Sequence, residues 1–161
     1  MECHTVRCMR QLSKRTQYCL RACYALTRKY GQGPVLIDQL AEDESIPKSF
    51  LEQILFSLKG HGLVLSKKGK GGGYYLAKPP EEITIASVIR MIEGPLAPLP
   101  CASETQFRKC DECPDVETCG TRIVMREVRD AVADILESRT LAAVCREVER
   151  AQRKRRRTAR R

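Results

Sequence analysis

Residues 45–76 read SIPKSFLEQILFSLKGHGLVLSKKGKGGGYYL, which places a turn, an amphipathic helix and a hairpin in immediate succession. The turn is Ser45-Ile46-Pro47, because proline suits the first turn of the helix that follows it. That helix is predicted over about Pro47–Gly60. Its buried stripe is expected to contain Leu51, Ile54, Leu55 and Leu58. A short amphipathic helix directly after a tight turn is typical of the reading helix of a helix-turn-helix protein.

The second half of this stretch predicts a β-hairpin. Two short segments, 64–67 and 73–76, flank a tip rich in lysine and glycine, and Pro79 and Pro80 end the second strand. Lysine supplies positive charge, and glycine lets the backbone approach a sugar–phosphate chain closely. A cationic finger of this kind suits a DNA groove. A nucleotide-binding loop is not supported, since neither a Walker spacing nor a strand–loop–helix order is present.

Helical patterns lie on both sides of this stretch. Helices are predicted at about Lys14–Tyr30, about Leu36–Glu42, after a cap at Thr84, at about 121–137, and at about 140–148. In the long helix at 121–137, apolar residues are spaced 3, 4 and 3 apart, which is the seam of a helix-on-helix contact. The seam residues are Met125, Val128, Val132 and Ile135. The predicted fold class is mainly α with a small β-hairpin wing: a winged helix-turn-helix plus a long C-terminal dimerisation helix.

Polar residues on the predicted reading helix are candidates for base contacts. Ser49 and Gln53 can donate or accept hydrogen bonds, and Glu52 can accept from a cytosine amino group. Lysines on the helix and hairpin are expected to hold phosphates. The predicted DNA-contacting set is Lys48, Ser49, Glu52, Gln53, Lys59, Lys67, Lys68, Gly69, Lys70, Gly71 and Gly72. For any single helix residue, the alternative is an ordinary solvated polar face.

The net charge of +9 is unevenly distributed along the 161 residues. Residues 1–78 hold 13 basic and 6 acidic side chains, residues 79–149 hold 8 and 14, and residues 150–161 hold 8 and none. A basic first half indicates DNA contact there and another task in the acidic second half. The expected organisation is a disordered leader at 1–8, a winged-helix DNA-binding domain at 9–80, a linking helix and cysteine-rich sensory loop at 81–120, a dimerisation helix and C-terminal helix at 121–149, and a basic disordered tail at 150–161.

The sequence predicts a cytoplasmic protein with no membrane contact. No apolar run approaches the roughly 20 residues that span a bilayer, and the N-terminus lacks the apolar core of a signal peptide. Nine cysteines in a reducing compartment indicate metal or redox chemistry rather than a disulfide scaffold. Cys19, Cys23 and Cys145 fall on apolar helix faces and are expected to be small core residues.

Four other cysteines cluster in a polar loop, where packing does not explain them. Cys101, Cys110, Cys113 and Cys119 have the spacing C-x8-C-x2-C-x5-C. Three interpretations fit: an iron–sulfur cluster on a flexible loop, structural zinc with four thiolates, or a thiol–disulfide switch that needs two of them. These residues alone do not separate the three.

Several segments together resemble the Rrf family of winged-helix transcriptional regulators, in particular its IscR-like and NsrR-like members. They are Leu12-Ser13-Lys14-Arg15, Phe50 to Leu55, Leu58 to Val64, Gly71 to Leu76, and Ile92 to Leu96. The resemblance covers about residues 9–148. It implies base reading by Ser49, Glu52, Gln53 and the wing, although Lys68 stands where the family usually has arginine.

The resemblance also favours an iron–sulfur cluster, either [2Fe-2S] or [4Fe-4S], with zinc as the weaker alternative. It assigns Cys101, Cys113 and Cys119 to the family's three loop cysteines and leaves Cys110 as an extra thiol. Where a histidine completes the site in the family's cluster regulators, this chain has Arg122, which cannot ligate. We therefore expect a homodimeric, non-enzymatic regulator that binds a pseudo-palindromic operator in double-stranded DNA and senses cluster status, redox state or nitric oxide. The alternatives are a cluster-free regulator switched by thiol oxidation or a partner protein and, less favoured, a thiol oxidoreductase using Cys110 and Cys113.

Overall fold

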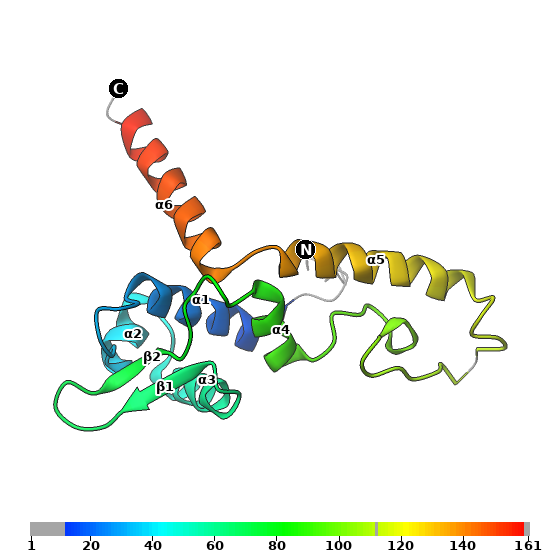
Figure 1. The fold of residues 1–161 in the computed structure, drawn as a ribbon, viewed down its shortest axis with the longest axis horizontal. Coiled ribbons are helices and arrows are strands. Elements are labelled where there is room, and N and C mark those ends of the chain that lie inside the picture. The colour runs from blue at the N-terminus through cyan, green and yellow to red at the C-terminus, as the bar shows by residue number, and fades with distance from the viewer. Residues whose placement is uncertain (1–11, 112, 160–161) are drawn as a thin grey trace, which may run out of the picture.

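The computed structural model describes residues 12–111 and 113–159, and within them it contains six α-helices and one antiparallel hairpin (Figure 1). The elements are α1 (Lys14–Arg28), α2 (Ile37–Asp43), α3 (Lys48–Gly60), β1 (Val64–Lys67), β2 (Gly73–Leu76), α4 (Ile85–Glu93), the 3-10 helix η1 (Pro100–Ala102), α5 (Gly120–Glu137) and α6 (Leu141–Thr158). This confirms the predicted mainly-α class with a small hairpin. The leader predicted at residues 1–8 lies outside the described residues.

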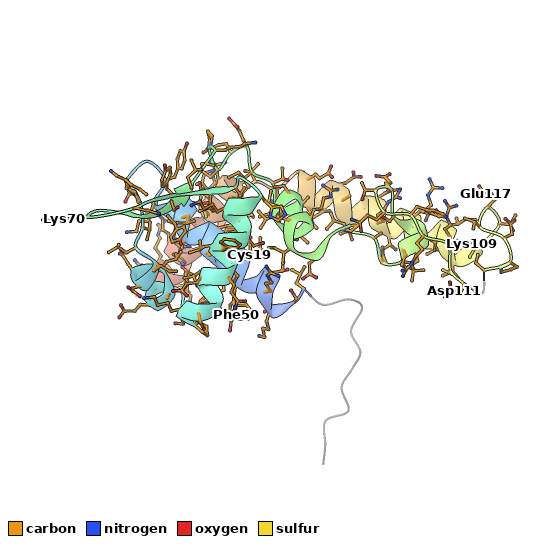
Figure 2. The ribbon with its side chains drawn as sticks, turned by 90° about the horizontal axis from the view of Figure 1, so that it is seen from below. Cys19, Phe50, Lys70, Lys109, Asp111 and Glu117 are labelled. Carbon is orange, nitrogen blue, oxygen red and sulfur yellow. The ribbon has the colours of Figure 1, made fainter. Side chains whose placement is uncertain are left out.

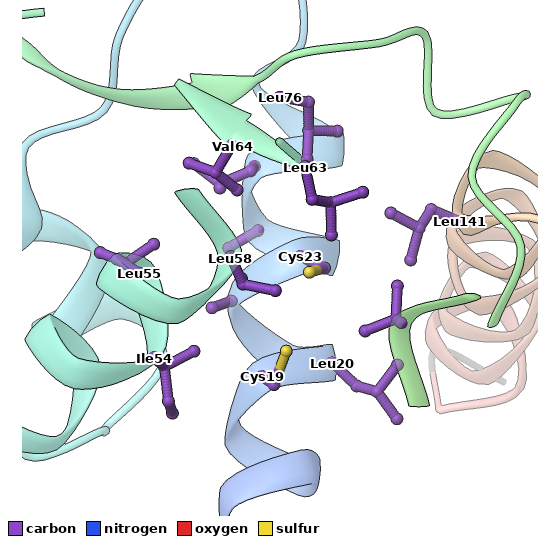
Figure 3. Packing of buried hydrophobic residues seen from close by; sticks show 14 of the residues in the cluster. Cys19, Leu20, Cys23, Ile54, Leu55, Leu58, Leu63, Val64, Leu76 and Leu141 are labelled. Atoms are coloured by element: carbon purple, nitrogen blue, oxygen red, sulfur yellow. The ribbon is translucent and has the colours of Figure 1, made fainter. Parts of the chain in front are cut away.

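The core lies where α1, α3, α4 and the hairpin meet (Figure 3). The predicted stripe of α3 is fully buried there, namely Leu51, Ile54, Leu55 and Leu58. Cys19 and Cys23 of α1 are 0% exposed and face the same core, which confirms their predicted packing role. Each fully buried leucine of this kind stabilises the fold by about 1.5–3 kcal/mol relative to an exposed one. The positions of α3 and the hairpin are therefore fixed by a continuous apolar cluster.

Three helices begin at a hydroxyl cap. Ser13 Oγ accepts from Thr16 N at 3.1 Å at the start of α1, and Thr84 Oγ1 accepts from Ser87 N at 3.1 Å at the start of α4, as predicted. Thr140 caps α6 in the same way. The starts of α4 and α6 are joined, because Ile85 N donates to Arg139 O at 2.8 Å and Leu141 N donates to Ile83 O at 2.9 Å. These bonds tie the base of α6 to the body.

The long helix α5 runs beside the connecting loop, apart from the core (Figure 1). Among its 18 residues only Arg129 is buried. Two residues of the predicted seam, Val132 and Ile135, are exposed. No helix within residues 12–111 and 113–159 has the length and apolarity needed to cross a membrane.

The last helix is much longer than predicted. It continues from Leu141 to Thr158, so the predicted disorder of residues 150–161 is wrong for 150–158, and the helix predicted at 140–148 is only its first half. The physical reason is that the buried first turns nucleate the helix, after which extension costs little. Arginine, lysine, glutamine and alanine are good helix formers, and cations are favourable near a helix C-terminus.

Candidate nucleic-acid interface and thiol site

The exposed face of α3 carries Ser49, Glu52, Gln53 and Phe56, whose spacing of i, i+3, i+4 and i+7 places them along one side of the helix. The buried stripe holds the opposite side, so this face is rigidly presented. The three polar residues lie where the sequence placed them. Their side chains provide donors and acceptors of the kind that read base edges in a major groove.

Phe56 belongs to this face and was not among the predicted contacts. It is 81% exposed, the most exposed large hydrophobic residue in the described part of the chain. The signal was present in the sequence, because Ile54, Leu55 and Phe56 are consecutive and a helix cannot turn all three toward one core. An exposed aromatic ring beside base-reading polar groups suits contact with a thymine methyl group.

The two predicted phosphate-binding lysines of α3 are both exposed but have protein partners. Lys48 Nζ lies 2.5 Å from Asp38 Oδ1 of α2, and this hydrogen bond raises the pKa of Lys48. Lys59 Nζ donates to Ser66 Oγ of β1 at 2.7 Å. Lys59 therefore links the end of α3 to the base of the hairpin, and both ammonium groups remain within reach of solvent.

The hairpin has the predicted lysine–glycine tip. Its strands pair from Val64 with Leu76 to Lys67 with Gly73. The tip comprises residues 68–72, and Lys70 lies at the far end of the molecule in Figure 2. Lys67, Lys68 and Lys70 are exposed, and none has an ion-pair partner in the described part of the chain. We call residues 64–76 the wing.

Two glycines of the wing are required by close backbone contacts. A Cβ on Gly72 would lie 2.4 Å from Lys67 O, inside the tip turn. A Cβ on Gly73 would lie 2.3 Å from Val35 O, and this residue has φ 143°. The close approach exists because Tyr74 exchanges hydrogen bonds with Val35, 2.8 and 2.9 Å long. The wing is thus anchored to the segment before α2.

The four predicted ligand cysteines all lie in the segment between α4 and α5, at the end of the molecule opposite the wing (Figures 1 and 2). Cys101 is in η1 and is 3% exposed. Cys110 is exposed, while Cys113 and Cys119 are partly exposed, with Cys119 at the start of α5. We call residues 100–119 the cysteine loop.

The thiols of the cysteine loop interact in two pairs. A hydrogen bond with Cys101 raises the pKa of Cys110, with smaller contributions from desolvation and nearby negative charge. Desolvation raises the pKa of Cys113, and the charge and hydrogen bond of Cys119 add to the shift. The raised pKa values keep Cys110 and Cys113 protonated at neutral pH. Any metal that binds as a thiolate complex must therefore release protons.

Two arginines of α5 hold the start of the cysteine loop. Arg122 Nε donates to Cys101 O at 2.9 Å, and Arg129 Nη1 donates to Ala102 O at 2.6 Å. Arg129, 8% exposed, also pairs with Glu104 at 3.1 Å and with Asp130 at 2.5 Å. Arg129 was not among the predicted site residues, and no role was predicted for Arg122. Both residues fix the backbone around Cys101 to the long helix.

The donor set of the cysteine loop fits a thiolate-ligated iron–sulfur cluster, although the sulfurs are not arranged as a closed site. No three His, Cys, Asp or Glu side chains among residues 12–111 and 113–159 have an arrangement that would hold a metal ion. Cys101 is fixed by Arg122, whereas Cys110 is exposed in the irregular part of the loop. Cys110 already lies within hydrogen-bonding reach of Cys101, so ligation would require a local rearrangement that brings Cys113 and Cys119 to the same centre.

Comparison with known proteins agrees with this architecture. The family model Rrf2, described as an iron-dependent transcriptional regulator, matches residues 12–147. An rrf2-like HTH-type transcriptional regulator of Rhodobacter capsulatus is 36% identical over 133 residues, covering 81% of this chain and 89% of the relative. The structure of CymR, the global cysteine regulator of B. subtilis, is 32% identical with a TM-score of 0.71, covering 86% and 98%. The structure of T. potens IscR is 31% identical, also with a TM-score of 0.71, covering 89% and 91%.

Proposed function

The chain belongs to the Rrf2 family of transcriptional regulators, and on that premise we propose that it is a cytoplasmic homodimer with a cluster-binding sensory loop. In this proposal α3 and the wing bind a pseudo-palindromic operator, and the cysteine loop responds to cluster supply, oxidants or nitric oxide. The protein acts by binding DNA and performs no catalysis.

The single observation that supports the DNA-binding proposal is that the exposed face of α3 and the wing are held together as one surface. The α3 face with Glu52, Gln53 and Phe56 is held by the core, and Lys59 ties it to the wing with its three exposed lysines. A reading helix in the major groove specifies sequence, whereas lysines on phosphates supply salt-dependent affinity. The arrangement supports one continuous contact with a duplex.

Homodimerisation is supported by the apolar side of α5. A groove of about 500 Å³ runs beside this helix and is lined by Met125, Val128, Val132 and Leu136 together with the loop after α4. An 18-residue helix with one buried residue gains little stability from its own chain. A second α5 packed on the 3-4-spaced seam would bury these residues and set two reading helices about one DNA turn apart.

Cluster sensing is supported by the chemistry of the cysteine loop. Cys101, Cys110, Cys113 and Cys119 would hold the cluster, whose redox state and integrity change with iron, oxidants and nitric oxide. Arg122 and Arg129 attach the backbone around Cys101 to α5. Rearrangement of the loop around Cys101 would therefore act on the helix that spaces the two wings. Regulation follows only if the two loop states differ in DNA affinity.

A thiol switch is the second candidate, favoured by the pairing of Cys101 with Cys110 and of Cys113 with Cys119. An oxidant such as hydrogen peroxide would accept two electrons, joining one thiol pair as a disulfide while two protons leave with the reduced oxidant. The same attachment to α5 would transmit this change.

The test is oxygen-free purification with iron and sulfide assays, an absorption spectrum, and titration of a duplex from the upstream region of its own gene. We expect bound iron and sulfide, and operator affinity that changes at least about 10-fold on cluster removal, equivalent to 1.4 kcal/mol. Each loop cysteine is replaced by alanine, with Cys145→Ala as the matched control outside the loop. Iron-free protein whose affinity changes only with peroxide would favour the thiol switch. Failure to bind the duplex in every state would refute the proposal.

A further inference from the structure

The second half of α6 is a dense cationic surface that the proposed function does not use. Six basic residues lie between positions 150 and 157, and no acidic residue follows Glu149 in the sequence. We call them the α6 tip: Arg150, Arg153, Lys154, Arg155, Arg156 and Arg157. All six are exposed, and none has an ion-pair partner among the described residues.

The first half of α6 carries both acidic and basic residues, whereas the second half carries only basic ones. At its base, Arg146 pairs with Glu81 at 3.8 Å, and Glu147 pairs with Arg139. At the tip the acids are gone, and like charges three and four residues apart destabilise a helix. An anionic partner would remove that repulsion. The tip therefore has the charge, and lacks the internal compensation, of a surface that binds a polyanion.

The tip is also ordered in a way that suits a row of phosphates. Arg150, Arg153, Lys154 and Arg157 follow an i, i+3, i+4, i+7 spacing and form one stripe. At 1.5 Å per residue the stripe is about 10 Å long, enough for several phosphates of one DNA strand. Residues 149–159 contain no aromatic or large apolar side chain. A protein groove would need such anchors, so a nucleic-acid backbone is the favoured partner.

The tip is held at a fixed place by the body. Leu141, Ala142 and Cys145 are buried at the base of α6, and Thr140 caps it. The tip then projects away from α3 and the wing: Figure 1 shows α6 leaving the opposite side of the body, and Figure 2, viewed from below, has α3 in front and α6 behind. A duplex bound by α3 and the wing of one protomer therefore lies on the far side from that protomer's tip.

From the charge, spacing and direction of this helix, we propose that the α6 tip is a second, sequence-independent DNA-binding site that takes the phosphate backbone of another duplex segment. A protein bound to its operator through α3 then captures further DNA through α6. The site joins two DNA segments and adds nothing to the choice of sequence.

The test is a bridging assay with the full chain. A bead-bound duplex is incubated with protein and a labelled duplex of scrambled sequence, and the label retained is measured. The test variant replaces Arg150, Arg153, Lys154 and Arg157 with glutamine, which preserves helix propensity, and circular dichroism checks that the helix is kept. The matched control replaces Lys67, Lys68 and Lys70 with glutamine.

We expect the wild-type protein to retain the label and the α6 variant to lose at least about 10-fold of it, with operator affinity within about 3-fold of wild type. Losing four phosphate contacts should also reduce the salt slope of labelled-duplex capture by about 3.6, at 0.9 per contact. The wing variant should still bind the scrambled duplex directly through α6. This binding therefore tests the α6 site even if the proposed operator binding by α3 and the wing is wrong. Equal capture by both proteins, no capture by wild type, preference for an RNA or acidic peptide competitor, or parallel loss of operator affinity would overturn the proposal.

Discussion

The winged-helix body and the segment that follows it use the same residue types for different ends. In the body, Cys19 and Cys23 are completely buried apolar filler, and the leucines of α3 close the core. In the cysteine loop, three of the four thiols are at least partly exposed, and the backbone is fixed by Arg122 and Arg129 instead of by a core. The difference shows that one chain buries the apolar residues of the body. The loop and α5 form their hydrogen bonds within the chain, but the apolar face of α5 remains exposed.

Thiol alkylation should separate the two regions most sharply. The hydrogen bond with Cys19, together with burial, raises the pKa of Cys23 well above its ordinary value. Because both thiols are completely buried, Cys19 and Cys23 should react only after global unfolding. The rate difference from Cys110 should be at least about 10³-fold, read by peptide mass mapping. Cys110 and Cys113 should react faster as pH rises, because their raised pKa values leave little thiolate at neutral pH. Fast labelling of Cys19 without denaturant would break the comparison.

The next largest effect is on stability. Leu58→Ala should lower the free energy of unfolding by about 2–5 kcal/mol, since it leaves a cavity in the closed core. Val124→Ala, on the exposed side of α5, is the matched control and should cost less than about 1 kcal/mol. Urea denaturation of both variants provides the measurement, and comparable losses would show that the body is not the stable unit.

Removing the arginine attachment should affect the loop and spare the body. Arg129→Met leaves Ala102 O without its donor and frees Glu104, a local loss of about 1–3 kcal/mol. Hydrogen exchange should rise in residues 100–119 and stay unchanged in α1 and α3. Arg126→Met, at an exposed position of the same helix, is the control. Unchanged exchange in the loop would show that Arg129 does not hold it.

The smallest expected effect is on base choice. Phe56→Ala should weaken operator binding by roughly 1–2 kcal/mol and reduce discrimination at a thymine, with unchanged stability because the ring is exposed. Phe56→Leu should restore part of the affinity. Binding to an operator series with each thymine replaced by uracil, which lacks the methyl group, provides the readout. Equal affinity of wild type and Phe56→Ala would remove this residue from the interface.

Much of the body could be predicted because local patterns decide it. The period of α3, the Thr84 cap and the lysine–glycine hairpin each express a short-range rule. Three features escaped. Arg129 binds a carbonyl 27 residues away, and no local pattern reveals that bond. Phe56 was not predicted, although a helix must turn one residue of the run Ile54-Leu55-Phe56 outward. The tail's charge indicated disorder, whereas a helix already nucleated at Leu141 extends to Thr158.

The sequence named the candidate site residues, but it did not predict how their side chains contact one another. The polar face of α3 and the wing lysines lie where their spacing placed them. For the cysteine loop, the sequence named the four thiols, but the pairing of Cys101 with Cys110 and of Cys113 with Cys119 depends on how an irregular loop folds. Irregular backbone has no period from which such contacts could be read.

The most direct measurement is anaerobic operator titration of the purified protein before and after treatment with an iron chelator, in parallel with Cys101→Ala. If the loop governs the wings, chelation and the substitution should shift operator affinity in the same direction and to the same extent, at least about 10-fold. Equal operator affinity in all three forms would contradict any link between the sulfur atoms and DNA.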